Sequence, residues 1–160
     1  MPYRVTFVCT GNICRSPMAE WVLRQHVEDE NLDVEVDSSG TGGWHVGDDA
    51  DERTVAALRR AGYRSAHIAR QFEPSWFHRY DLIIALDEGH RRALLSMAPD
   101  EASRGRVRLL REFDPDASPS NLDVPDPYYG DRADFDLVLE QVEASMPGVL
   151  EEIRTALKER

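Results

Sequence analysis

The chain has 160 residues, 41% hydrophobic and 31% charged, and this length and mixture predict one folded domain spanning residues 1–160. Its net charge of −11 excludes the basic surface that non-specific nucleic-acid binding requires, so no nucleic-acid partner is expected. No apolar run reaches the ~20 residues that cross a bilayer, and the N-terminus lacks the apolar region of a signal peptide. We therefore expect a cytoplasmic protein without membrane contact.

The first third of the chain predicts two strands, a helix and a long loop. Residues 4–9 are β-branched and aromatic, which indicates a buried strand. Ser16-Pro17 then predicts a helix start, with serine as the cap and proline in the first turn. Residues 34–38 alternate between apolar and polar side chains and predict a second strand. Four glycines within residues 40–47 predict a loop around Trp44.

The rest of the chain continues the alternation of strands and helices. Helices are predicted at residues 51–61, 74–79 and 88–97, and strands at 81–86 and 107–110. Residues 114–133 are rich in Asp, Pro and Ser and predict a long surface loop. Apolar residues at helical spacing from 135 to 157 predict a last helix, which Pro147-Gly148 should kink or split.

Strands that alternate with helices predict an α/β fold. We expect a single domain with a four-stranded parallel sheet and helices on both faces. In such folds, ligands bind beyond the carboxyl ends of the strands. The first predicted strand ends at Cys9, so a ligand site is expected directly after this strand, and the motif found there, described next, predicts that it is a phosphate-binding loop.

The most unusual motif of the chain is a cysteine followed at fixed spacing by arginine and serine, within residues 9–16, here called the phosphate loop. A thiol becomes a nucleophile when it ionises, and a helix N-terminus or a nearby cation favours ionisation. Backbone N–H groups before a helix also attract phosphate. Arg15 offers a planar fork for two phosphoryl oxygens. Ser16 can donate a hydrogen bond to the Cys9 thiolate.

A structural interpretation of the same residues competes with the chemical one. A lone buried cysteine such as Cys9 is usually a small hydrophobic residue. Arg15 could be a solvated residue of the first helical turn, although a cation is unfavourable at a helix N-terminus. Gly11 and Asn12 tolerate the positive φ angles of a tight loop in either case.

Expulsion of an alkoxide or phenolate by Cys9 requires a proton donor, and a positioned acid contributes about 10²–10⁴-fold. Our candidate is Asp126, which lies between two prolines in residues 124–130, here called the acid loop. Asp-Pro is also a common turn dipeptide. By composition and spacing alone, three further carboxylates compete for this role: Asp114, Asp116 and Asp123.

These motifs together resemble the low-molecular-weight protein tyrosine phosphatases of the bacterial type. The similarity covers almost the whole chain, in residues 8–17, 37–41, 44–47, 67–71, 86–87 and 126–130. It implies hydrolysis of phosphotyrosine in proteins, with inorganic phosphate as a product. Cys9 resembles the nucleophile that forms a phosphocysteine. Arg15 resembles the residue that binds the phosphoryl oxygens, and Asp126 resembles the general acid.

The resemblance also implies residues that bind the substrate and support the loop. Trp44 and Tyr128 resemble walls for the substrate ring. Ser38 and His67 resemble supports of the phosphate loop, and Asp87 resembles a structural partner whose role stays open. The substrate-binding set is Thr10, Gly11, Asn12, Ile13, Cys14, Ser16, Trp44, Tyr128 and Tyr129. The remaining histidines are predicted to be surface residues: His26, His45, His78 and His90.

Three other functions fit the same loop. Family members that reduce arsenate use additional cysteines, whereas this chain has only Cys9 and Cys14. Members that hydrolyse phosphoarginine carry threonine where this chain has Ile13. A non-catalytic module that binds phosphotyrosine would retain Arg15 but lose the nucleophile or Asp126.

The remaining expectations concern redox chemistry, cofactors and partners. The resemblance implies a reversible disulfide between Cys9 and Cys14, and the alternative is that Cys14 packs under the loop. No cofactor and no metal are expected, because Arg15 and the backbone N–H groups neutralise the phosphate charge. The partners expected are tyrosine-phosphorylated proteins. The family implies a monomer or a weak homodimer.

Overall fold

The computed structural model describes residues 1–160. Its four strands form one sheet in the order β2-β1-β3-β4, and every neighbouring pair is parallel. The strands are β1 (Tyr3–Cys9), β2 (Val34–Gly40), β3 (Leu82–Ala85) and β4 (Val107–Leu109). In the register, Val5 of β1 is the partner of Val36 on one side and of Leu82 on the other. The predicted four-stranded parallel α/β fold is confirmed.

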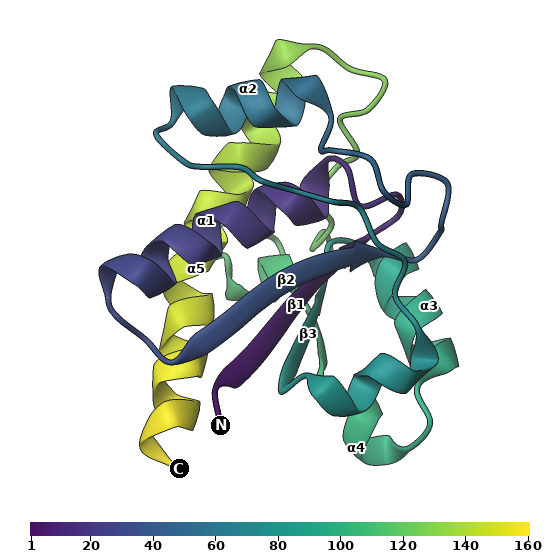
Figure 1. The fold of residues 1–160 in the computed structure, drawn as a ribbon, viewed down its shortest axis with the longest axis vertical. Helices are drawn as coiled ribbons and strands as arrows, with labels where there is room; N and C mark the ends of the chain where they lie inside the picture. Colours follow the sequence, from purple (N-terminus) through teal and green to yellow (C-terminus); the bar gives the residue numbers. More distant parts are fainter.

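Helices cover both faces of the sheet. Figure 1 shows α1, α2 and α5 on one side, and α3 and α4 on the other. The helices are α1 (Arg15–Asp29), α2 (Glu52–Arg60), α3 (Glu88–Met97), α4 (Glu101–Arg104) and α5 (Arg132–Lys158), with 3₁₀ turns η1 (Pro74–Arg79) and η2 (Leu110–Phe113). The short helix α4 and the turn η2 were not predicted, although Asp100 caps α4 by accepting the Ser103 N–H at 2.7 Å.

Each face of the sheet has its own core. Phe7 and Ile84 belong to the larger cluster, which includes the apolar stripe of α5. Their neighbours Val8 and Ile83 belong to a smaller cluster, which includes Phe77 of η1. This alternation follows from the period of two in a strand. Because both faces are buried, the strands read as nearly continuous apolar runs.

The last helix is not split at Pro147, and it starts earlier than predicted. α5 runs from residue 132 to 158 without splitting at Pro147. Gly148 allows α5 to pack closely against η2, because a Cβ at this position would lie 2.7 Å from the Phe113 carbonyl oxygen. α5 begins three residues before the predicted position, since the Asp131 carboxylate accepts the N–H groups of Ala133 and Asp134 as an N-cap.

The strand order places a topological switch between β1 and β3. The chain leaves β1 toward β2 on one side and returns to β3 on the other. Ligands of open α/β sheets bind beyond the carboxyl ends of the strands at such a point. Cys9 ends β1, and Asp87 follows β3 and caps α3. Both termini lie at the opposite end of the sheet (Figure 1). None of the helices has the length and apolarity that a membrane span requires.

Candidate active site

The phosphate loop joins β1 to α1, and the Cys9 thiol in it lies next to the Ser16 hydroxyl. Cys9 Sγ lies 2.9 Å from Ser16 Oγ. The same hydroxyl accepts a hydrogen bond from Asn12 Nδ2 at 2.8 Å. The Ser16 hydroxyl can donate its one proton either to the sulfur or to the Ser39 carbonyl oxygen, which is farther away at 3.4 Å. The prediction that Ser16 caps α1 is wrong: Cys14 holds the cap position, without a side-chain bond.

Asn12 holds the loop in a left-handed conformation, with φ at 58°. Its side chain donates to Ser38 Oγ at 2.9 Å and accepts the Arg70 N–H at 2.9 Å. Its carbonyl oxygen lies 2.6 Å from His67 Nε2, which must therefore carry the proton. These bonds compensate for the cost of a positive φ in a residue other than glycine.

A buried glutamate completes this support, and the sequence analysis missed it. Glu20 is 5% exposed, and its Oε1 accepts the Ser38 hydroxyl at 2.6 Å. Its Oε2 accepts Arg24 Nε at 2.7 Å, and its Oε1 lies 3.8 Å from His67 Nδ1. Burial lowers the pKa of His67, although the Asn12 carbonyl and Glu20 act in the opposite direction. The sequence does contain a signal that could have identified Glu20: it lies one helical turn after Ser16, between the apolar residues Ala19 and Trp21.

The end of β2 packs directly against the phosphate loop. A Cβ on Gly40 would lie 2.5 Å from the Thr10 carbonyl oxygen and 3.1 Å from the Asn12 nitrogen. The Thr41 N–H also donates to the Cys9 carbonyl oxygen at 2.8 Å. Only glycine permits this approach, which positions Ser38 under the loop.

Arg15 is buried, at 4% exposure, and is fixed by several partners. Its Nη1 donates to the Asp87 carboxylate at 2.8 Å and to the Val124 carbonyl oxygen at 2.9 Å. Its Nη2 faces Thr10 Oγ1 at 3.5 Å and Asp126 Oδ2 at 3.9 Å. The interpretation of Arg15 as a solvated residue is therefore wrong. One edge of the guanidinium is anchored, and the other is directed into the site.

His90 was predicted to lie on the surface, and this prediction is wrong. It is 4% exposed, because the first turn of α3 packs over Arg15. Its Nε2 lies 2.8 Å from Thr10 Oγ1 and 3.4 Å from Arg15 Nη2. Burial and the neighbouring Arg15 charge lower the pKa of His90 to about 4, although Asp87 favours protonation. Because Arg15 Nη2 can only donate, Nε2 of the neutral ring is the acceptor, and Nδ1 carries the proton. Nδ1 lies 3.2 Å from Asp87 Oδ1 but makes no hydrogen bond to it.

Asp87 joins Arg15 to α3. Its Oδ2 binds the guanidinium, and its Oδ1 caps the helix by accepting the His90 N–H at 2.9 Å. Burial opposes ionisation of Asp87, but the bonds from His90 and Arg15 outweigh it and lower the pKa of the carboxyl. The role that the sequence left open is thus an ionic anchor for Arg15.

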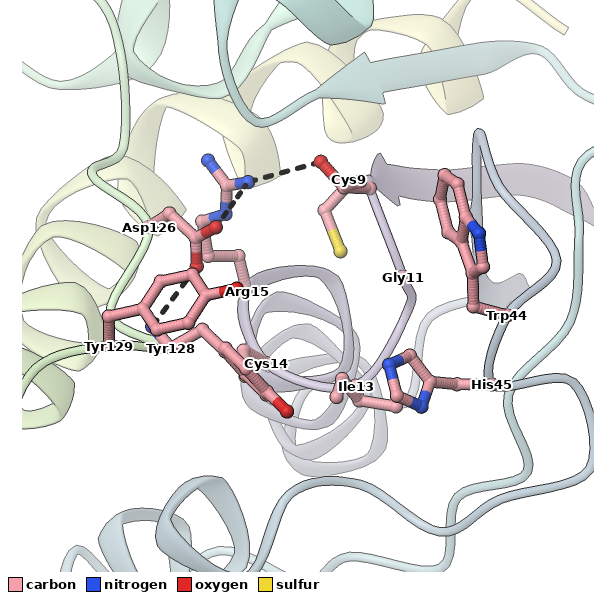
Figure 2. A pocket seen from close by; sticks show the side chains of 11 residues that line it. Cys9, Gly11, Ile13, Cys14, Arg15, Trp44, His45, Asp126, Tyr128 and Tyr129 are labelled. Atoms are coloured by element: carbon pink, nitrogen blue, oxygen red, sulfur yellow. Dashed lines mark hydrogen bonds and ion pairs between the residues drawn. The ribbon is translucent and has the colours of Figure 1, made fainter.

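These elements surround a cavity of about 270 Å³. The Cys9 sulfur points into it, with Trp44 on one side and both Tyr128 and Tyr129 on the other (Figure 2). Predicted residues make up most of its lining: Cys9, Thr10, Gly11, Ile13, Cys14, Arg15, Trp44, Asp126, Tyr128 and Tyr129. Asn12 and Ser16 belong to the phosphate loop but do not line the cavity, and Ser38 and His67 support the loop from behind. The lining residue that was not predicted to belong to the site is His45, which was predicted only to lie on the surface.

Asp126 is the only one of the four candidate acids that lines this cavity. Its Oδ1 accepts the Tyr128 N–H at 3.1 Å, and its side chain is half exposed. Asp114 is buried beside Arg111, and Asp123 accepts the Glu88 N–H. Geometry thus separates carboxylates that composition could not.

Cys14 lines the same cavity as Cys9, and both are free thiols. Cys14 is 5% exposed. Burial, with added repulsion from Asp51, raises the pKa of the Cys14 thiol to about 12. Cys14 is therefore a neutral thiol at physiological pH.

Comparisons with known proteins give a consistent result. The model of a family described as low molecular weight phosphotyrosine protein phosphatase matches residues 4–159. The chain is 57% identical to a low molecular weight protein-tyrosine-phosphatase of Streptomyces coelicolor, over 100% of this chain and 99% of the relative. It is 48% identical to low molecular weight protein-tyrosine phosphatase A of Mycobacterium tuberculosis, over 92% and 90%.

A solved structure agrees with the fold. The crystal structure of a protein tyrosine phosphatase from Entamoeba histolytica matches with a TM-score of 0.90 and 31% identity, over 96% of this chain and 98% of that one. The family model spans nearly the whole chain, and the site lies at the switch point of the shared fold. The chain belongs to the low molecular weight phosphotyrosine protein phosphatase family.

Proposed function

We propose that this protein hydrolyses phosphotyrosine in proteins through a phosphocysteine intermediate on Cys9. The observation that carries the proposal is one cavity in which the Cys9 sulfur, the free edge of Arg15 and the Asp126 carboxylate meet. A nucleophile, a phosphoryl-binding cation and a proton donor are the groups that this reaction requires.

The first step transfers the phosphoryl group to the enzyme. The phosphoryl oxygens accept hydrogen bonds from backbone N–H groups of the phosphate loop and from Arg15. The Cys9 thiolate attacks phosphorus, so an S–P bond forms while the bond to the tyrosine oxygen breaks. Asp126 donates its proton to that oxygen, and tyrosine leaves as the neutral phenol.

The second step releases phosphate. The Asp126 carboxylate takes a proton from a water molecule, whose oxygen attacks phosphorus. The S–P bond breaks, inorganic phosphate leaves, and Cys9 returns to the thiolate. Ser16 Oγ, 2.9 Å from the sulfur, stabilises the thiolate in both its attacking and leaving roles.

The walls of the cavity favour an aromatic phosphate ester. Trp44 and Tyr128 offer ring faces on opposite sides of the Cys9 sulfur, and Ile13 adds an apolar contact. The anchored guanidinium of Arg15 supplies the local positive field in a chain of net charge −11. Two free thiols suit the reducing cytoplasm, where we place the reaction on tyrosine-phosphorylated proteins.

The alternatives within the same fold are not favoured. Arsenate reduction needs cysteines beyond Cys9 and Cys14, and the chain has no others. Phosphoarginine hydrolysis is less suited to the apolar Ile13 side chain in the cavity. A module that only binds phosphotyrosine does not require a proton donor, whereas Asp126 lines the same cavity as Cys9.

Turnover of a phosphotyrosine peptide tests the proposal, with a chelator present and phosphoarginine assayed in parallel. Wild type should release inorganic phosphate, Cys9→Ser should be inactive, and Asp126→Ala should be slower by about 10²–10⁴-fold. Binding of the peptide without turnover would instead support a silent module, and faster turnover of phosphoarginine would overturn the substrate assignment.

A further inference from the structure

Arg53, near the start of α2, contacts both its own helix cap and the acid loop. Its Nε and Nη2 donate to the two Asp51 carboxylate oxygens at 3.0 Å each. Its other N–H groups reach across to the acid loop, where Nη2 donates to the Tyr128 carbonyl oxygen at 2.9 Å. Nη1 donates to the Gly130 carbonyl oxygen at 3.1 Å. One planar guanidinium thus joins two segments more than 70 residues apart in sequence.

The same guanidinium is held on its faces by aromatic rings. Its carbon lies 4.4 Å from the ring centroid of Phe135, in the first turn of α5, and 5.7 Å from that of Tyr128. Figure 1 shows α2 beside the start of α5. The edge bonds and the stacking restrict Arg53 to one orientation, which a lysine ammonium could not reproduce.

Asp126 has few contacts of its own that could set its position. Its carboxylate accepts the Tyr128 N–H at 3.1 Å and lies 3.9 Å from Arg15, with half of its side chain exposed. The backbone of residues 126–130 must therefore orient it. Arg53 binds this backbone at Tyr128, the residue whose N–H contacts Asp126.

The other end of this connection lies on the phosphate loop. The Asp51 N–H donates to the Ile13 carbonyl oxygen at 2.8 Å. Asp51 also accepts the Arg53 N–H at 2.9 Å as the cap of α2. A continuous chain of contacts therefore runs from the phosphate loop through Asp51 and Arg53 to the acid loop. These contacts link the acid loop, which carries Asp126, to the phosphate loop, which carries Cys9.

We infer that Arg53 is a positioning residue that holds Asp126 where it can protonate the leaving group. The inference rests on the proposed function, because it assigns Arg53 a part in the acid step of that reaction. A misplaced acid matters most for leaving groups that need the proton. Loss of Arg53 should therefore slow poor leaving groups selectively.

The experiment compares kcat/KM for phenyl phosphate, a poor leaving group, with that for 2,4-dinitrophenyl phosphate, a good one. Arg53→Ala and Arg53→Lys should lose about tenfold or more with phenyl phosphate and under about threefold with the dinitrophenyl ester. Arg60→Ala is the matched control, because Arg60 lies on the same helix and pairs only with Asp136. It should behave as wild type with both substrates.

A double variant separates positioning from general damage. If Arg53 acts through Asp126, adding Arg53→Ala to Asp126→Ala should cause little further loss with phenyl phosphate. Equal losses with both substrates, or losses that multiply in the double variant, would overturn the inference. The proposed function fails separately, when wild type hydrolyses neither ester or when Asp126→Ala shows no leaving-group dependence.

Discussion

Ser38 donates a hydrogen bond of 2.6 Å to the buried Glu20 carboxylate, beneath the phosphate loop. Ser38 Oγ also accepts from Asn12, so Ser38→Ala would leave two buried groups one partner short. We expect the free energy of unfolding to fall by about 1–3 kcal/mol, measured by urea denaturation. Affinity for phosphate should fall as well, because Asn12 then holds the loop less firmly.

The neighbouring serine provides the control. Ser39 is equally buried on β2, but its hydroxyl has no hydrogen-bond partner. Ser39→Ala should therefore change stability by under about 0.5 kcal/mol or increase it, since a buried unpaired hydroxyl is costly. Equal losses in the two variants would contradict a specific role for the Ser38 bonds.

His90 makes stability depend on pH. Its pKa is lowered to about 4 by burial and by Arg15, whereas an unfolded histidine titrates near ~6.5. Between these values the unfolded chain binds a proton that the folded chain does not, so the free energy of unfolding falls as pH falls. The loss should total on the order of 3 kcal/mol by pH 4.

Denaturation at several pH values between 7 and 4 checks this expectation. His90→Asn removes the titrating ring, so its stability should depend less steeply on pH than that of wild type. The difference between the two proteins cancels the titration of the carboxylates. Parallel curves would show that His90 does not carry the effect.

Asp87→Asn separates the ionic anchor of Arg15 from the helix cap. Asparagine can still accept the His90 N–H, so α3 should keep its cap. The buried guanidinium loses its negative partner, and we expect a loss of about 1–3 kcal/mol in stability and weaker inhibition by phosphate. Asp123→Asn, at the same end of α3, is the comparison, because Asp123 bonds the Glu88 N–H and not Arg15. Equal inhibition of Asp87→Asn and Asp123→Asn by phosphate would show that the Asp87–Arg15 ion pair does not contribute to phosphate binding.

Trp44 is 74% exposed, so it contributes little to the core. Trp44→Ala should leave the thermal midpoint within about 2 °C of wild type. It should raise KM for aryl phosphates severalfold while changing KM for a small alkyl phosphate little, because only a ring can stack on the indole. Steady-state kinetics with both substrate types decide this, and an equal rise in KM for both would exclude stacking.

The sequence predicted the fold well, because strands buried on both faces read as short apolar runs and glycine or proline marks their ends. Cys9 and Arg15 were also identifiable, since their spacing places a thiol and a cation at a helix start. His90 and Glu20 were missed for a common reason. Each is buried through partners distant in sequence, such as Thr10 at 80 residues and Ser38 at 18. From the local sequence pattern alone, such polar residues on helices are predicted to be exposed to solvent.

The choice of Asp126 as the candidate acid also depended on contacts that the local sequence pattern does not show. Asp126 and Asp114 both precede a proline, and only the path of the loop brings Asp126 within 3.9 Å of Arg15. That path depends on bonds such as that from Arg53 to the Tyr128 carbonyl oxygen. The pattern of the chain does not encode them locally.

The most direct test of the proposed mechanism is to trap the phosphocysteine intermediate on Cys9. The protein is mixed with a phosphotyrosine peptide, quenched within milliseconds, digested and analysed by mass spectrometry. The proposed mechanism predicts one phosphoryl group on Cys9 in wild type and none in Cys9→Ser. Release of inorganic phosphate by wild type with no phosphoryl group on Cys9, or with the group on another residue, would contradict it.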